Sequence, residues 1–512
     1  MNESKEYNHQ SFHVDYNNLI SKVSFEFKNS LAALASPTLS KQETVTYLYK
    51  SIRENEGSIN HKPSLPWFKI ILFIPRLVLC LFRIIYASIQ FKVNHIPKNA
   101  IVFRTWFGPN SINNSLLVDS YFGELSDQLA EYENVVVTYT PDNLQSFNKV
   151  TKNNLKPNHI ISYGLLDLKD ICKLFVEYII SGLIQAKQQY FFNGNEVTTY
   201  INRSLLIDYL GLRSFEAYAE KYKCEKLLSF KIKAFIYVFE NQSWEKVCCK
   251  ILSKHDVRII GYQSSGFSPL FLNFFPTQVD SVIHPMPDLL LTVGEYFKKY
   301  LLEKGSYTIP VEVFSAIRFK YPFENNYYSV LSPNPALHYR ILFAFSVHKI
   351  QYKYIINDLI SVFEDSLIRI DLKFHPDHDL AKITKELELP DNINIVKSVE
   401  IDSLRDMYDF VLFNDNSFGI ESLLCGVKSY QYCRESLVSD NRFLYFNLWD
   451  VNYQIQELRK LKNNYESGDI DKEFNIEEVR NYVNMMFQPF TKDSCKEFLN
   501  FLNQSSPSTY IN

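Results

Sequence analysis

Residues 366–380 have the sequence SLIRIDLKFHPDHDL, in which an apolar run ends abruptly in basic and acidic side chains. The run from 367 to 374 is short and rich in branched residues, which is typical of a buried β-strand, and His375-Pro376 favours a turn after it. Similar runs occupy the neighbouring sequence at 340–346, 392–398, 409–415 and 428–432. Buried strands that alternate with helix-like segments predict a parallel α/β sheet.

The earlier part of the chain repeats this alternation. Its β-rich runs lie at 99–107, 134–140, 159–164, 234–240, 257–263, 289–294 and 311–317, and helix-like segments lie between them, as at 167–192 and 243–255. A polar stretch with two prolines, 325–339, separates the two sets of strands and predicts a linker. We therefore expect two Rossmann-like α/β domains facing a cleft, at 95–325 and 335–450, with an N-terminal extension over 1–94 and a helical C-terminal segment over 451–512.

The composition of the 512-residue chain is that of a globular protein too long for one ordinary core. A net charge of −3 gives no indication of a nucleic-acid partner. The eight cysteines are scattered and form no CxxC pair, so we expect reduced cytosolic thiols and neither a zinc site nor a disulfide framework. The polar start of the chain is not typical of a secretory signal.

Residues 67–91, WFKIILFIPRLVLCLFRIIYASIQF, form a basic and apolar stretch. Lys69, Arg76 and Arg83 recur every seven residues, which places them on one face of a helix and leaves uncharged pieces shorter than the roughly 18 residues of a spanning helix. Pro75 is expected to break or kink this helix. Since residues 57–118 contain no Asp or Glu, we expect an amphipathic anchor on an anionic membrane surface. A core helix whose charges reach the surface, or a kinked span, are the alternatives.

Polar side chains follow three strands of the second predicted domain. Ser346 ends the first strand, Lys373 and His375 end the second, and Asn416-Ser417 ends the third and leads into a helix at 418–426. Ser417 stands where an N-cap belongs, and the free N–H groups of a helix start suit a phosphate. We expect these groups to meet at one edge of the sheet, since the ends of parallel strands lie together.

An apolar strand ending in Lys-x-His-Pro, followed by a strand, an Asn-x-Asn-Ser turn and a helix, resembles the donor-binding half of GT-B glycosyltransferases. The pattern is most similar to bacterial transferases that use CMP-activated sugars, namely Kdo (3-deoxy-octulosonic acid) and sialic-acid-like sugars. This resemblance implies phosphate contacts by His375 and Ser417 with Lys373 nearby, and a ribose contact by Glu421. Asn416 departs from the family's doubled Ser-Ser or Ser-Thr, which puts its phosphate contact in doubt. CDP-glycerol-type phosphotransferases show the same pattern.

The first predicted domain resembles a group of bacterial surface-carbohydrate biosynthesis proteins. The motifs that carry this resemblance are VFRTWF at 102–107, YFGEL at 121–125, FENQSWEK at 239–246 and GYQSSGFSPLFLNFFP at 261–276. Together with the donor-side motifs, they cover most of residues 100–430.

Glu240 is the leading candidate for the group that acts on the acceptor hydroxyl, because it ends the strand at 234–240 and is expected to face the cleft. The alternative is that Glu240 caps the following helix, with Glu245 an ordinary first-turn acid. His375 is the second expected catalytic residue, because it would stabilise the leaving phosphate. Residues expected to contact the acceptor or other substrate groups are Arg104, Trp106, Asn241, Gln263 and Ser264.

Two further clusters are interpreted as structural. His284-Pro285 precedes a strand and is interpreted as a turn. Asp377, His378 and Asp379 resemble metal ligands in composition, but they share one short loop without the spacing of a metal site. GT-B enzymes usually work without a catalytic metal, so neither a metal nor another cofactor is expected beyond the sugar donor.

The sequence thus predicts a glycosyltransferase that moves Kdo or a sialic-acid-like sugar from a CMP donor to a surface glycan of capsule, lipopolysaccharide or O-antigen. Its expected location is the inner face of the bacterial inner membrane, as a peripheral protein. A UDP- or GDP-sugar transferase, a CDP-glycerol-type phosphotransferase and a non-catalytic binding protein are the alternatives.

Overall fold

The computed structural model describes residues 9–42, 67–108, 111–113, 115–142, 144–264, 266–267, 271–318, 340–346, 349–375, 380, 383, 387–414, 416–425, 427–432, 455–467 and 476–504. Its contacts divide the described chain into two units. The first unit runs from α1 (His9–Glu26) to β11 (Val311–Val313) and includes α18 (Ser494–Asn503). The second unit runs from β12 (Arg340–Ala344) to α17 (Ile476–Met486).

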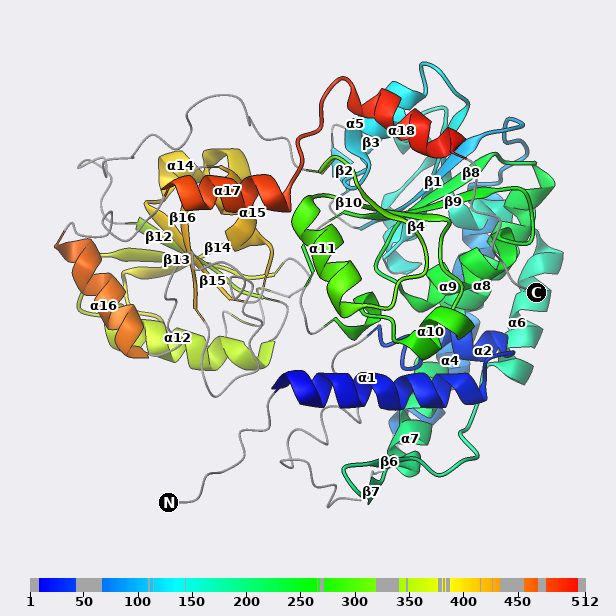
Figure 1. Ribbon diagram of the computed structural model, residues 1–512, viewed down its shortest axis with the longest axis horizontal. Helices are drawn as coiled ribbons and strands as arrows, with labels where there is room; N and C mark the ends of the chain where they lie inside the picture. The colour runs from blue at the N-terminus through cyan, green and yellow to red at the C-terminus, as the bar shows by residue number, and fades with distance from the viewer. Residues whose placement is uncertain are drawn as a thin grey trace. The chain divides into compact units, whose positions relative to one another are not determined.

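The first unit is built on a seven-stranded parallel sheet (Figure 1). Its strand order is β11-β10-β9-β8-β1-β4-β5, with β1 (Ile101–Phe107), β4 (Val135–Pro141), β5 (His159–Ile161), β8 (Ala234–Val238), β9 (Arg258–Gln263) and β10 (Leu289–Thr292). Every residue of β4 and β8 is buried, as expected for strands covered on both faces. Two small antiparallel hairpins, β2–β3 (Ile112–Asn113, Leu116–Leu117) and β6–β7 (Phe191–Phe192, Asn195–Glu196), complete the strands.

Helices cover both faces of this sheet. On one face, the Phe103 ring packs against Phe122 and against Phe498 of α18, with ring centres 4.9 and 6.1 Å apart. On the other face, the next residue, Arg104, points toward α8, as the alternation along a strand requires. The remaining helices of the unit are α2 (Leu31–Ala35), α4 (Trp67–Gln90), α5 (Gly123–Leu129), α6 (Leu168–Ser181), α7 (Thr198–Leu210), α8 (Phe215–Ser229), α9 (Ser243–Leu252), α10 (Gln278–Ile283) and α11 (Glu295–Lys304), with 3₁₀ turns η1 (Leu144–Lys149), η2 (Lys152–Asn154), η3 (Ser162–Leu165) and η4 (Leu272–Phe274).

The second unit has a five-stranded parallel sheet in the order β14-β13-β12-β15-β16 (Figure 1). Its strands are β13 (Arg369–Lys373), β14 (Ile393–Val396), β15 (Phe410–Phe413) and β16 (Lys428–Gln431) besides β12, and its helices are α12 (Lys349–Phe363), α14 (Leu404–Met407), α15 (Phe418–Leu424), α16 (Ile455–Glu466) and α17, with a 3₁₀ turn η5 (Ile401–Ser403). A continuous apolar cluster joins the sheet to α12 and α16 through residues such as Phe343, Phe363, Ile370 and Tyr465.

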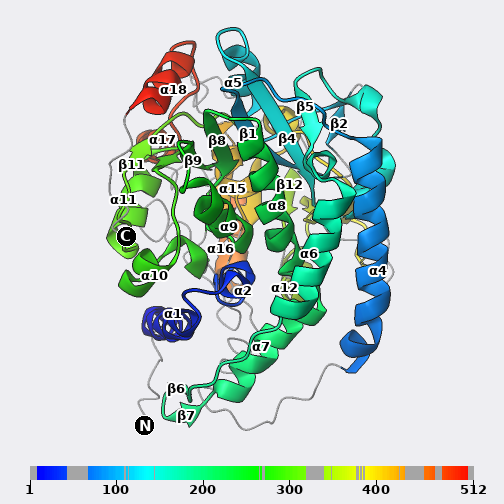
Figure 2. The same cartoon turned by 90° about the vertical axis from the view of Figure 1, so that its right-hand side faces the viewer.

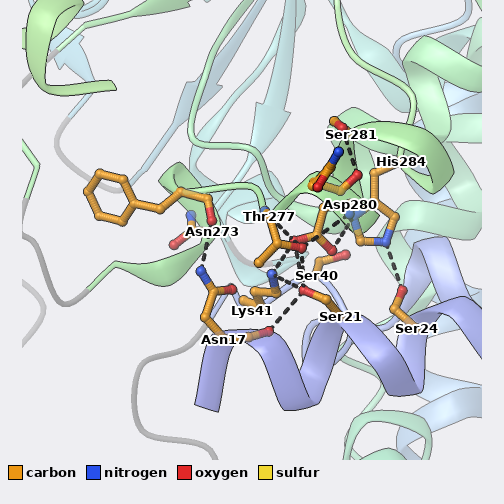
Figure 3. A network of polar contacts seen from close by, with 12 residues as sticks. Asn17, Ser21, Ser24, Ser40, Lys41, Asn273, Thr277, Asp280, Ser281 and His284 are labelled. Atoms are coloured by element: carbon orange, nitrogen blue, oxygen red, sulfur yellow. Dashed lines mark hydrogen bonds and ion pairs between the residues drawn. The ribbon is translucent and has the colours of Figure 1, made fainter. Parts of the chain in front are cut away.

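Residues 9–42 are part of the first unit, and a buried polar network ties them to it (Figure 3). Lys41, 3% exposed, forms an ion pair with Asp280 of α10, and its ammonium also donates to the Ser21 hydroxyl at 2.8 Å. The Ser24 hydroxyl of α1 lies 2.8 Å from Nε2 of His284. Burial alone raises the pKa of Asp280, but the Lys41 ammonium overrides this and holds the pKa below its ordinary value.

The predicted fold class, two Rossmann-like α/β domains, is confirmed. The twelve β-rich runs correspond to the seven strands of one sheet and the five of the other. The single helix expected over 167–192 is wrong, because α6 ends at Ser181 and the β6–β7 hairpin follows. Pro75 does not break the helix, because α4 continues through it, and the kink that was the other expectation stays a prediction. The predicted C-terminal helices are present, but α16 and α17 belong to the second unit and α18 to the first. The predicted linker lies outside the described residues.

Candidate active site

Both sheets have a topological switch point, where the direction of strand succession reverses. The first strand of each sheet, β1 or β12, lies between the second and the fourth strands of that sheet. Open α/β sheets bind ligands outside the carboxyl ends of their strands at this point. In the first unit the switch point lies between β1 and β8, and in the second between β12 and β15. The residues that follow these strands are therefore the candidates for ligand contact.

In the first unit, the loop after β8 is held by the buried carboxylate of Glu245. Its Oε1 accepts hydrogen bonds from the backbone N–H groups of Glu240 at 3.0 Å and Gln242 at 3.1 Å, and its Oε2 accepts from Asn241 at 2.9 Å. Burial raises the pKa of Glu245, and the N–H donors oppose this rise. Glu245 is thus not the ordinary first-turn acid of the prediction, because it fixes the backbone of three preceding residues.

The carboxylate of Glu240 is oriented by its neighbours at the end of β8. The side-chain amide of Gln242 donates to Oε2 of Glu240, and the indole N–H of Trp244 donates to Oε1 of Gln242 at 2.8 Å. The backbone carbonyl of Glu240 accepts from the side chain of Asn273. Burial raises the pKa of Glu240, which brings it closer to the range of a general acid or base at neutral pH. Glu245, and not Glu240, holds the N–H groups at this helix start.

Two further groups lie near Glu240 at this edge of the sheet. Burial raises the pKa of Tyr121 to about 12, and the charge of Glu240 adds to the rise. The exposed guanidinium of Arg318, which follows β11, lies 5.9 Å from the centre of the Tyr121 ring. A carboxylate, a phenol and a guanidinium therefore lie together here, and sequence reasoning missed the last two because they come from distant segments.

Arg104 has a structural environment that leaves no surface for an acceptor, since it is 1% exposed. Its guanidinium lies 3.6 Å from the ring centres of both Trp106 and Trp244, and it forms ion pairs with Glu216 at 3.1 Å and Glu220 at 3.3 Å. Arg104 therefore forms a buried salt bridge with α8 in place of the predicted contact with an acceptor. Trp106, half-buried, packs edge-on against Trp244 with ring centres 5.6 Å apart.

The other predicted substrate contacts of this unit are engaged with the backbone. Asn241 has a positive φ of 52°, a region that Asn tolerates well, and its side chain donates to the carbonyl of Asn273 at 2.7 Å. Oε1 of Gln263 accepts from the N–H of Val293 at 3.2 Å. Gln263 and Ser264 lie at the end of β9 and are both almost fully buried. The side chains of Asn241 and Gln263 therefore hold the backbone of neighbouring segments at the ends of β8, β9 and β10.

In the second unit, asparagine side chains cross the switch point. The N–H of Ser346 donates to Oδ1 of Asn414 at 3.0 Å, which joins the ends of β12 and β15. The amide of Asn416 donates to the carbonyl of Ala344 at 2.7 Å, and its Oδ1 accepts from the N–H groups of Phe418 at 3.0 Å and Gly419 at 3.4 Å. The side chain that caps α15 is therefore Asn416, whereas the sequence predicted Ser417.

The structure brings Lys373 to the start of α15, as the sequence predicted. The register places Lys373, Ala344 and Phe413 level at the carboxyl ends of their strands, and the Lys373 ammonium lies 4.3 Å from the ring centre of Phe418. Burial lowers the pKa of Lys373, and the charge of Glu421 opposes this. A half-buried ammonium at this edge suits an anion.

The other residues predicted to contact the donor also lie at the carboxyl edge of the second sheet, but they differ in how exposed they are. The Ser417 hydroxyl donates to Oε1 of Glu421 at 2.9 Å, so the predicted phosphate and ribose contacts are bonded to each other. Glu421 is 7% exposed, and Ser346 is fully buried. His375 lies half-buried two residues beyond the end of β13. The loop residues 376–379, and His348 after Ser346, lie outside the described residues.

Among the described residues, one cluster offers ligand atoms to a metal ion. A carboxylate oxygen of Glu220 and the sulfurs of Cys224 and Cys248 lie within 4.8 Å of one another in the core. The Glu220 carboxylate already faces two cations, Lys223 at 3.0 Å and Arg104 at 3.3 Å, and burial raises the pKa of the Cys248 thiol. These charges fit a buried salt bridge better than a cation site.

No protein-family model matches this chain, and no curated protein does. Solved structures resemble it at low identity. The glycosyltransferase SnogD from Streptomyces nogalater is 15% identical over 79% of this chain and 100% of its own, with a TM-score of 0.44. UDP-N-acetylglucosamine 2-epimerase from Rickettsia bellii is 12% identical over 80% of this chain and 96% of its own, with a TM-score of 0.45. The UDP-GlcNAc 2-epimerase from Neisseria meningitidis bound to UDP-GlcNAc is 11% identical over 79% and 100%, with a TM-score of 0.43. Such low values assign neither a substrate nor a reaction to this chain.

Proposed function

We propose that this chain is a glycosyltransferase of GT-B organisation that uses a nucleotide sugar. The observation that carries the proposal is the oriented carboxylate of Glu240 at the switch point of the first sheet, beside Tyr121 and Arg318. The second sheet places the half-buried ammonium of Lys373 at its own switch point, where nucleotides bind in related architectures. In this proposal the base belongs to the first unit and the anion site to the second.

In the proposed reaction, Glu240 accepts the proton of the acceptor hydroxyl as its oxygen bonds to the anomeric carbon of the donor sugar. The bond between that carbon and the phosphate oxygen breaks, and the nucleotide leaves with the electron pair. Lys373 and His375 would stabilise the charge that develops on the phosphate. Since Gln242 donates to one oxygen of Glu240, the other oxygen remains for the acceptor.

The donor proposed from the sequence motifs is a CMP-activated Kdo or sialic-acid-like sugar, and the acceptor is a surface glycan. A UDP- or GDP-sugar is the alternative donor. The CDP-glycerol-type phosphotransfer differs in the bond that breaks, which would be a phosphorus–oxygen bond. We also propose that α4 holds the protein at an anionic membrane surface on the cytoplasmic side, where lipid-linked acceptors are found.

Nucleotide binding tests this proposal directly. Calorimetric titration of the full chain with CMP, CDP, UDP and GDP is expected to give binding by a cytidine nucleotide, and stronger binding by a uridine nucleotide would favour the alternative. Lys373→Met is expected to weaken binding about tenfold or more through loss of a charge-assisted contact. Lys353→Met, at an exposed position of α12, is the matched control. Binding that is absent for all four nucleotides, or equal in the two variants, contradicts the donor site.

Transfer itself tests the role of Glu240. With the donor and acceptor identified by mass spectrometry of the product, Glu240→Gln is expected to bind nucleotide normally and to lose transfer by a factor of about 100 or more. Glu312→Gln, on β11 of the same unit, is the control for the loss of a carboxylate. If Glu240→Gln keeps full turnover, Glu240 has no part in the reaction.

A further inference from the structure

The helix α4 has an exposed apolar face along its whole length. Six of its residues pack against the first unit at helical spacing: Phe73, Leu77, Cys80, Ile84, Ala87 and Ser88. The opposite face presents large apolar side chains to solvent, among them Ile71, 73% exposed, and Phe82, 64% exposed. By length and composition alone α4 would pass as a membrane span, but the packing of one face from Phe73 to Ser88 fits a helix that lies along a surface.

A second helix continues this exposed face. Figure 2 shows α6 running beside α4 on the same side of the first unit, and the two helices are in contact. Val176, Ile179 and Ile180 of α6 follow the spacing of one helical face, and all three are exposed, Ile180 by 75%. Two adjacent helices with apolar faces form a patch well beyond the scattered exposed side chains of an ordinary surface.

Both helices of the patch carry basic side chains, and the acidic side chains at α6 form ion pairs with lysines. On α4, Arg76 is exposed and Lys69 and Arg83 are half-buried, and none of the three forms an ion pair with a described residue, although the charge of Asp208 acts on Lys69. On α6, Lys169 and Lys173 are exposed and likewise unpaired among the described residues. The acids of α6 are matched by neighbouring lysines: Asp167 and Asp170 by Lys226 at 2.9 and 3.0 Å, and Glu177 by Lys221 at 2.7 Å.

We propose that α4 and α6 together form one membrane-binding surface, which inserts its apolar side chains into an anionic lipid bilayer with both helices along the bilayer plane. The inference rests on the membrane association proposed for α4 and assigns α6 as its second half. Anionic lipid is the occupant that the charges favour, because the patch is apolar with unpaired cations. A second copy of the chain on the same face would bring these like charges together.

Vesicle sedimentation of the full chain tests the surface. Binding is expected to vesicles of phosphatidylglycerol and phosphatidylcholine and to be much weaker to phosphatidylcholine alone. The double variant V176S/I180S in α6 and the double variant I71S/F82S in α4 are each expected to raise the lipid concentration for half-binding at least tenfold. V282S/L367S, which replaces two side chains that are 79% and 88% exposed elsewhere, is the matched control and should bind like the original chain.

Cys172 gives a second measurement at the surface itself. It is exposed on α6 and lies one turn before Val176, so an environment-sensitive fluorophore on its sulfur reports immersion. In a C425S/C433S background, addition of anionic vesicles is expected to shift its emission to shorter wavelength.

The possible results of these measurements refute different parts of the proposal. Full binding by V176S/I180S with loss by I71S/F82S would refute the role of α6 and leave that of α4. Equal vesicle binding by all variants and the control would refute insertion through α4 and α6, and no binding by the original chain would refute membrane association. Nucleotide titration of the same proteins judges the donor site separately. A lipid-free dimer in sedimentation velocity that V176S/I180S dissociates would overturn the proposal in favour of self-association.

Discussion

Glu245→Gln is the substitution that best tests how the candidate active site is held in place. The carboxylate is 1% exposed and accepts three backbone N–H groups of the loop that carries Glu240. In the best orientation of the amide, its oxygen keeps the bonds to Glu240 and Gln242, and its NH₂ group faces the N–H of Asn241. One buried N–H then has no acceptor, which costs about 1–3 kcal/mol, and the two remaining bonds lose their charge assistance. We expect a total loss of about 2–3 kcal/mol, and about 4 kcal/mol for Glu245→Ala.

Hydrogen exchange measured by mass spectrometry suits this prediction, because peptides from β8 and α9 report local stability without assuming two-state unfolding of a two-unit chain. Glu295→Gln, at an exposed first-turn position of α11, is the control and should change the exchange by less than about 0.5 kcal/mol. If Glu245→Gln exchanges like the original chain, the carboxyl group is neutral in the fold and no buried charge fixes this loop.

Three other substitutions test the packing and the buried charges. Burial lowers the pKa of Lys246 from 10.5 to about 7. Between these two pH values the unfolded chain binds more protons than the folded chain, so the free energy of unfolding should rise with pH by at most about 1.4 kcal/mol per pH unit. Lys246→Met should flatten this rise, as measured by urea unfolding at several pH values. Burial likewise lowers the pKa of His159 from 6.5 to about 4, so stability should fall as the pH drops through this window, and His159→Phe should reduce that fall. Gly419→Ala would place a Cβ 2.0 Å from the Phe413 ring, and proteolysis should show the second unit destabilised by about 1–3 kcal/mol.

The strands were predictable from the sequence because they are short, β-rich runs between polar segments, and the clearest, such as β8 and β15, are fully apolar. The end of α6 was not predictable, because the apolar pattern continues beyond it. Ala186, Tyr190 and Phe192 pack in a cluster with residues of α7 and of α1, which is distant in the sequence. Helix boundaries set by tertiary contacts escape local reasoning in this way.

The candidate site was predictable in position and less so in detail. Strand ends located Glu240 and Lys373, since parallel strands end at one edge. The roles of Asn416 and Ser417 were exchanged, because both residue types cap helices well and only the backbone geometry decides between them. The burial of Arg104 follows from Glu216 and Glu220 on α8, more than a hundred residues away, which no spacing rule connects to β1.

The Lys41–Asp280 ion pair bears on the minimal folding unit of this protein. A chain shortened to begin at residue 95, the domain boundary predicted from the sequence, would lose Lys41, Ser21 and Ser24 together with α4. Asp280 would then have lost its main counter-charge, and His284 the hydroxyl at its Nε2. The α/β sheet is therefore not an autonomous module with a leader attached. We therefore expect a first domain produced alone to need α1 and Lys41 in order to keep this polar network with α10.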